Sequence, residues 1–114
     1  MQAVAFASPL LPGKEETDRQ GIERLTSGED REAYAAARRS QGITREAVWH
    51  QTTPNGVFAI VLIEADDLQR AFQAIATSDA PIDRQFREMV MDVHGFDLAS
   101  DPPPDVRPIS DVRF

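Results

Sequence analysis

The feature that most constrains this chain is an unbroken apolar run, Val57 to Ile63, which follows directly on a turn signal. The turn residues Thr53-Pro54-Asn55-Gly56 separate this run from a β-branched and aromatic segment, Glu46 to Thr52, so the two segments predict a β-hairpin. In a strand with one face in water, apolar and polar residues alternate. Here they do not, and both faces of the predicted sheet therefore need cover. The two apolar rows are Phe58, Ile60 and Leu62 on one face and Val57, Ala59, Val61 and Ile63 on the other.

A single copy of the chain has helices for only one face of such a sheet. The predicted order is strand, helices, strand, strand, helices, and in a ferredoxin-like arrangement the helices return to the same side. Leaving the row from Val57 to Ile63 in water would lose several kcal/mol of hydrophobic stabilisation, at about 25 cal/mol per Å2, and would expose an apolar patch. We therefore predict an α+β protein with a ferredoxin-like antiparallel sheet, helices on one face, and the other face packed in a homodimeric α+β barrel. The alternative is that the helices of residues 14–41 and the C-terminal tail supply the second layer within one chain.

Local signals place the elements before the hairpin. Val4 to Ala7 is a short apolar run ended by Pro9, which predicts a first strand. Lys14 to Leu25 is mostly charged and predicts a helix with a narrow buried stripe. Glu29 to Gln41 is rich in Ala, Glu and Arg and predicts a second helix, with Gly42 as its left-handed cap.

Two more helices and a tail are expected after the hairpin. Asp66 or Asp67 can cap a helix, and Pro81 suits the first turn of another helix that Gly95 closes. The apolar stripe of the first of these helices is Leu68, Ala71, Phe72 and Ile75. We assign residues 1–98 to the domain and residues 99–114 to a proline-rich tail that forms an edge strand or a dimer arm.

Composition excludes several classes of function. The length of 114 residues suits one domain, and a hydrophobic content of 41% is enough for a core. The net charge of −7 argues against nucleic acid and anionic membranes as partners. No apolar run approaches the about 20 residues of a membrane helix, and the N-terminus lacks the pattern of a signal peptide. The chain has no cysteine, so a reducing compartment is expected and the cytoplasm is the predicted location.

The element order over Ala3 to Gly95 resembles the dimeric α+β barrel superfamily, a ferredoxin-like group that includes antibiotic-biosynthesis-type monooxygenases and stress-responsive barrel proteins. Within it, the chain is similar to small bacterial proteins of unknown role. Three short patterns carry the similarity: Glu46-Ala47-Val48-Trp49 before the turn, Thr53-Pro54-Asn55-Gly56 in it, and Asp83, Phe86 and His94-Gly95-Phe96-Asp97-Leu98 after it. The resemblance implies a homodimer with a ligand cavity between sheet and helices, but no specific activity. The chain departs from the group in lacking a last strand, where the proline-rich tail stands instead.

Four side chains are candidates for a small-molecule site. His50 is the candidate catalytic residue because histidine titrates near neutrality, although the simpler explanation is a histidine at a sheet edge that is hydrogen-bonded to backbone or solvent. Trp49 beside it serves as a ligand platform, as core or as dimer interface. Tyr34 and Arg38, with Arg39, could bind a carboxylate or phosphate, since a guanidinium fork recognises these groups bidentately. The simpler explanation is that two arginines near a helix C-terminus offset the helix dipole.

No motif demands a metal or a cofactor, and we expect neither. The carboxylates of Glu64, Asp66 and Asp67 are explained by helix capping, and the spacing of His50 and His94 requires no metal. His94 is expected to cap free carbonyls at a helix end. The chain contains no GxGxxG, Walker, HExxH or GxSxG motif.

Three functions remain open at this point. The first is a homodimeric barrel that binds a small organic molecule, extending by resemblance to a cofactor-independent monooxygenase-like or isomerase-like enzyme. The second is a noncatalytic structural or regulatory dimerisation module. The third is a protein that docks on another protein through residues 102–114.

Overall fold

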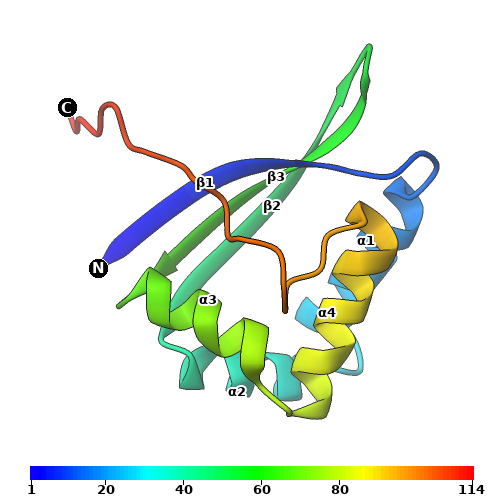
Figure 1. Cartoon of the computed structure of the whole chain (residues 1–114), viewed down its shortest axis with the longest axis horizontal. Coiled ribbons are helices and arrows are strands. Elements are labelled where there is room, and N and C mark those ends of the chain that lie inside the picture. Colours follow the sequence, from blue (N-terminus) through cyan, green and yellow to red (C-terminus); the bar gives the residue numbers. More distant parts are fainter.

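Three strands form one antiparallel sheet, and four helices lie on one side of it, in a computed structural model that describes residues 1–114 (Figure 1). The strands are β1 (Gln2–Pro9), β2 (Ile43–Thr53) and β3 (Gly56–Ala65). The helices are α1 (Glu15–Thr26), α2 (Arg31–Ser40), α3 (Leu68–Thr77) and α4 (Pro81–His94). Strand β3 lies between β1 and β2 and pairs antiparallel with both. The predicted α+β class and the order of strands and helices are confirmed.

The predicted hairpin joins β2 to β3. Thr53 pairs with Gly56 across the turn, and Gly56 has a φ of 118°, a conformation that favours glycine. The Thr53 hydroxyl donates a hydrogen bond of 2.8 Å to the Gly56 carbonyl and accepts one of 3.1 Å from the Asn55 N–H. Because side chains alternate along a strand, the register fixed by this turn decides which face each residue occupies.

The predicted start of α3 and both predicted ends of α4 are confirmed by their capping residues. The Asp67 carboxylate accepts the Arg70 N–H at 3.1 Å and so caps α3. Pro81 occupies the first turn of α4, and Gly95 ends that helix in the left-handed region with a φ of 69°. Gly42 follows α2 with a φ of 76°. The chain therefore turns sharply at the positions where the sequence offers glycine or proline.

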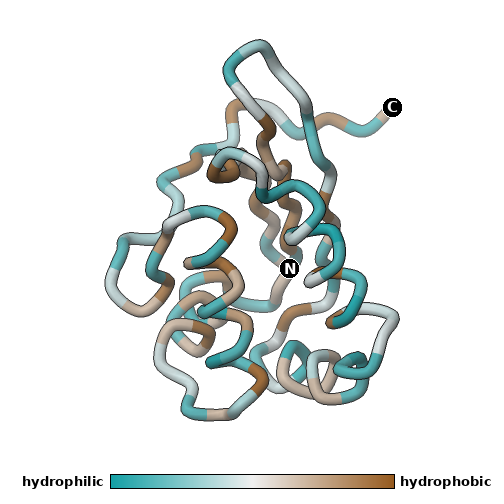
Figure 2. The backbone as a smooth tube through the Cα atoms, turned by 90° about the vertical axis from the view of Figure 1, so that its right-hand side faces the viewer, coloured by the Kyte–Doolittle hydropathy of each residue, from teal (hydrophilic) through white to brown (hydrophobic).

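The apolar core lies between the sheet and the helices. Figure 2 shows the most hydrophobic stretches of the backbone along the strands near the middle of the molecule. One cluster joins the sheet to α3, and a second joins it to α4. The first consists of Ile43, Ile63, Ala65, Ala71 and Ile75, and the second of Leu10, Ala59 and Val93.

The helices cover the row of β3 that we expected to be open. Ala59 and Ala65 on this row are fully buried, and Val61 and Ile63 between them pack on the same core. The prediction that the row from Val57 to Ile63 stays uncovered is therefore wrong. The two rows are similarly apolar, but the small side chains of Ala59 and Ala65 let Val93 and Ala71 pack close to the backbone of β3. The other row, Phe58, Ile60 and Leu62, has only large side chains and leaves no such space.

The opposite face of the sheet carries no helix. It consists of Ala5 and Ala7 from β1, Ala47 and Trp49 from β2, and Phe58, Ile60 and Leu62 from β3, and we call this surface the open face. Trp49 is 53% exposed, and the three large side chains of β3 are half-buried by their neighbours. One apolar face of the sheet is thus without cover within a single chain.

The chain after α4 adds no strand. Leu98 packs against the core, but every residue from 99 to 114 is exposed, and the C-terminus lies away from the helices (Figure 1). The outer edge of β1 therefore pairs with no strand, at the place where a ferredoxin-like sheet has its fourth strand. No helix of the protein has the length and apolar content needed to cross a membrane.

Candidate functional site

A buried polar cluster joins α2, β2 and α4 on the helix side of the sheet. Its members are Tyr34, Arg38, Gln41, Glu46 and Asp83. Tyr34 and Arg38 are four residues apart and therefore lie on one face of α2. Glu46 points from β2 toward the same side because it pairs with Ile63, whose side chain belongs to the core. Asp83 lies in the first turn of α4.

Arg38 is the centre of this cluster. Its Nε donates to Glu46 Oε1, its Nη1 donates to Gln41 Oε1 at 2.9 Å, and Nη1 lies 3.5 Å from Asp83 Oδ1. The Gln41 amide in turn donates to Asp83 Oδ1 at 3.1 Å. The guanidinium carbon also lies 4.4 Å from the centre of the Tyr34 ring, within the range of a cation–π contact. Arg38 is therefore held by charge, hydrogen bonds and packing together.

The cluster keeps Arg38 charged and Tyr34 neutral. The Tyr34 hydroxyl donates to Glu46 Oε2 at 2.7 Å. Burial raises the pKa of Tyr34, and the negative charge of Glu46 raises it further against the opposing effect of Arg38. Burial by itself lowers the pKa of Arg38, but contacts with Tyr34 and Glu46 outweigh it, so this pKa lies above its ordinary value. One guanidinium faces two carboxylates here, and every buried polar side-chain atom has a partner.

A hollow of about 270 Å3 opens between α2 and the beginning of β2, next to the cluster. Tyr34, Arg38 and Glu46 line it. Three further arginines also line it: Arg31, Arg39 and Arg45. The hollow is therefore rich in arginine, and the sequence analysis identified three of its residues, Tyr34, Arg38 and Arg39.

His50 and Asp18 form a separate polar pair on the helix side. His50 Nε2 lies 2.7 Å from Asp18 Oδ2, and the Asp18 side chain is only 3% exposed. This pair joins β2 to α1. A buried carboxylate that orients a partly exposed imidazole is an arrangement suited to proton transfer at the free Nδ1. The sequence analysis identified His50 but missed Asp18.

Trp49 does not belong with the other three predicted residues. It pairs with Ile60 and lies on the open face, whereas His50, Tyr34 and Arg38 lie on the helix side. Adjacent residues of a strand point to opposite faces, so Trp49 and His50 cannot line one cavity within a single chain. The predicted four-residue set is thus divided by the sheet.

His94 contacts a different carbonyl from the one expected. It lies in the last turn of α4, but its Nδ1 contacts the Pro9 carbonyl oxygen at 2.9 Å and the Ser8 hydroxyl at 3.1 Å. The end of α4 is closed instead by the Gly95 N–H, which donates to the Met91 carbonyl. His94 therefore ties α4 to the end of β1, and the prediction that it caps its own helix is wrong.

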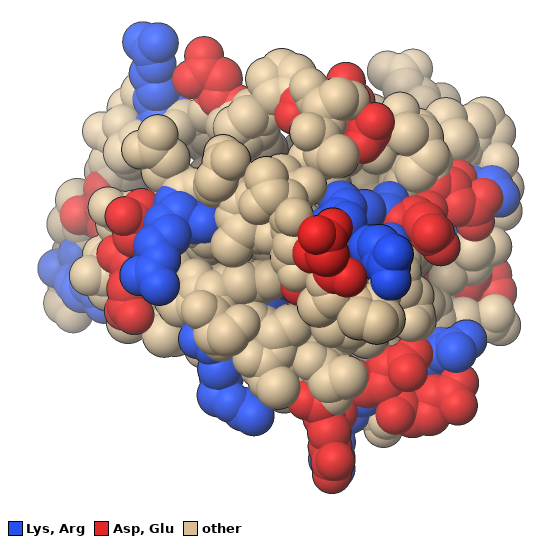
Figure 3. Space-filling view, turned by 60° about the horizontal axis from the view of Figure 1, so that its bottom comes forward, with Lys and Arg blue, Asp and Glu red and all other residues tan.

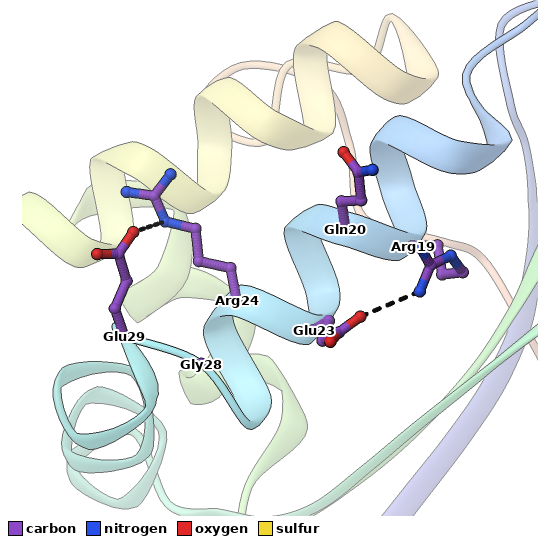
Figure 4. Close-up of a pocket in the computed structure, with 6 residues that line it drawn as sticks. All are labelled: Arg19, Gln20, Glu23, Arg24, Gly28 and Glu29. Atoms are coloured by element: carbon purple, nitrogen blue, oxygen red, sulfur yellow. Dashed lines mark hydrogen bonds and ion pairs between the residues drawn. The ribbon is translucent and has the colours of Figure 1, made fainter.

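A larger hollow on α1 offers no free binding groups. It measures about 520 Å3 and is lined only by polar residues and Gly28, as Figure 4 shows. Arg19 contacts Glu23 at 3.0 Å, and Arg24 contacts Glu29 at 2.9 Å. Since the charged side chains around this hollow already pair with one another, the hollow between α2 and β2 is the better candidate.

No group of three or more His, Asp or Glu side chains is arranged to hold a metal ion. On the face shown in Figure 3, most basic side chains lie beside acidic ones, in agreement with the surface ion pairs. Comparison of the chain with protein-family models, with curated proteins and with solved structures found no match.

Proposed function

We propose that this protein is a homodimeric α+β barrel of the type that it resembles, and that each protomer binds a small organic molecule on the helix side of its sheet. The observation that carries the proposal is the open face. No helix packs on it, and every tail residue that follows Leu98 is exposed. A second copy of the chain is the occupant that best fits this surface.

The shape of the open face supports self-association. Phe58, Ile60 and Leu62 form a central ridge, and the neighbouring positions of β1 are alanines. Ala5 pairs with Leu62 and Ala7 with Ile60, so a groove of small side chains runs beside the ridge. Two sheets related by a two-fold axis can place the ridge of each in the alanine groove of the other, as facing layers of large and small side chains do in sheet packing.

The ends of the open face are polar and limit its extent. Arg45 lies 3.7 Å from Glu64 at one end, and Gln51 lies opposite Phe58 at the other. An apolar centre with a polar rim is the usual anatomy of a protein interface. Burying the ridge and Trp49 against a partner would remove their exposed apolar area from water, which stabilises by about 25 cal/mol per Å2.

Sedimentation of the wild-type chain and of two variants tests the proposal. The wild type should sediment at twice its chain mass of 12.7 kDa at micromolar concentration. Ile60→Lys should be monomeric because it places a charge in the middle of the interface. Met91→Lys is the matched control: Met91 is 45% exposed on α4, away from the open face, and its replacement should leave the dimer intact.

A monomeric wild type would contradict the proposal. So would an Ile60→Lys variant that remains a dimer, since the contact would then lie elsewhere on the molecule. The circular dichroism spectrum of each variant must match that of the wild type, because the two residues are not deeply buried and their replacement leaves the core intact.

The His50–Asp18 pair favours one alternative, a cofactor-independent enzyme of the monooxygenase-like or isomerase-like kind. Asp18 is buried and its carboxylate contacts Nε2 of His50, so the other ring nitrogen, Nδ1, remains without a hydrogen bond within the protein. This is the arrangement by which a carboxylate sets the tautomer of a general base. In the other alternative, a noncatalytic dimerisation module, the His50–Asp18 pair would only join β2 to α1 and would catalyse no reaction.

A further inference from the structure

We infer that the hollow between α2 and β2 binds the carboxylate or phosphate groups of a small organic molecule. This inference rests on the small-molecule part of the proposed function and names its site and ligand class. It does not depend on the dimer, because α1, α2 and β2 of one chain supply the whole lining of the hollow.

The local charge at the hollow is opposite to that of the whole protein. The chain has 12 basic and 19 acidic residues, which gives a net charge of −7. Four arginines and a single carboxylate, that of Glu46, line this hollow. A concentration of guanidinium groups in an acidic protein attracts anions to that one position while the rest of the surface repels them.

Two of these arginines have no partner of opposite charge. Arg31 and Arg39 form no ion pair, whereas Arg19 and Arg24 on the neighbouring helix each contact two carboxylates. The guanidinium of Arg45 lies 3.7 Å from Glu64, which belongs to the open face, so it is not one of the ligand-binding groups of the hollow. The guanidinium groups of Arg31 and Arg39 at the rim are thus free to bind a ligand.

Arg38 supplies a fixed donor deeper in the hollow. Its Nε and Nη1 bind Glu46 and Gln41, and these two contacts set the plane of the guanidinium. Its Nη2 forms no hydrogen bond within the protein, and this atom is not fully buried. A donor whose orientation is already fixed loses little entropy when it binds a carboxylate or phosphate oxygen.

The size and remaining lining of the hollow define the ligand further. A volume of about 270 Å3 accommodates a small organic acid or a small phosphate ester. Leu25, Ala35 and Ile43 provide apolar contact for the carbon skeleton. The net charge of the protein disfavours a nucleic acid backbone as the source of the phosphate, so a free small molecule is the inferred ligand.

Isothermal titration with citrate and with inorganic pyrophosphate tests the inference, at constant ionic strength. Citrate presents carboxylates and pyrophosphate presents phosphates, so the two titrations distinguish the two ligand chemistries. The wild type should bind at least one of them with a Kd below about 1 mM. The double variant Arg31→Gln with Arg39→Gln should bind that probe at least about tenfold more weakly, because two charge-assisted contacts are lost.

Arg84→Gln is the matched control. Arg84 is exposed on α4, forms no ion pair and does not line the hollow, so this variant should bind as the wild type does. Ile60→Lys should also bind unchanged, which separates failure of the dimer from failure of the ligand site. The inference is overturned if the wild type binds neither probe in this range, or if Arg84→Gln weakens binding as much as the double variant.

Discussion

The buried position of Arg38 leads to a large predicted loss of stability on its replacement. Its side chain is 7% exposed and contacts Glu46 and Asp83, and the Asp83 side chain is 4% exposed. In Arg38→Met the apolar packing is largely kept, but both carboxylates lose their cation. Breaking a buried ion pair from one side costs about 3 to 5 kcal/mol, against a total unfolding free energy of about 5 to 15 kcal/mol for a domain.

Urea unfolding followed by far-ultraviolet circular dichroism measures this loss. With a slope of about 1.5 kcal/mol per molar urea, the midpoint of Arg38→Met should fall by about 2 to 3 M. Adding Asp83→Asn to the same chain should recover part of the loss, since it removes a buried carboxylate that has lost its cation. Recovery by a second substitution identifies the uncompensated charge, and not lost packing, as the cause.

Arg19→Met is the comparison that isolates burial. Arg19 also contacts two carboxylates, Glu16 and Glu23, but its side chain is 57% exposed. Water screens those contacts, so the midpoint should move far less than in Arg38→Met. If the two substitutions lower the midpoint equally, the reasoning from burial is refuted.

Two further predictions concern the other titratable groups of the helix side. Tyr34 is the only tyrosine, so the ultraviolet absorbance of phenolate reports its ionisation directly. Burial raises its pKa, and the native protein should therefore titrate at higher pH than the unfolded chain, for which about 10 is expected. The folded state binds the proton more tightly, so this contribution to stability is present below pH of about 10 and is lost as the pH rises above it; identical native and unfolded titrations would exclude the effect. His50→Ala should lower the unfolding free energy by about 1 to 3 kcal/mol because it leaves the buried Asp18 carboxyl without a partner, and urea unfolding of the single variant and of the double variant with Asp18→Asn measures it. A single variant as stable as the wild type would show that the contact is unimportant.

The sequence was sufficient to predict the hairpin, the start of α3, both ends of α4 and the existence of one uncovered sheet face. Turn residues, capping residues and the alternation of strand side chains are local signals, and each acts within a few positions of the chain. The sequence could not reveal which of two apolar rows faces the helices. That choice depends on contacts such as Ala59 with Val93, which join residues far apart in the chain.

The buried charges were missed for a related reason, although a signal was present. Asp18 lies four and seven residues before Ile22 and Leu25, so it belongs to the apolar stripe of α1. Asp83 precedes Phe86 by three residues and Val93 by ten, which places it on the buried stripe of α4. A carboxylate within such a stripe predicts a buried partner, but its identity comes from another element and requires the folded structure.

Successive residues of strand β2 point to opposite faces of the sheet. Ala47, Trp49 and Gln51 belong to one side of the sheet, and Glu46 and His50 to the other. A substitution scan along this strand should therefore give an alternating record, in which odd positions alter self-association and even positions alter the chemistry beneath the helices. Neighbours in this strand lie on opposite sides of the sheet, whereas Gln41 and Asp83, 42 positions apart, are joined by a hydrogen bond.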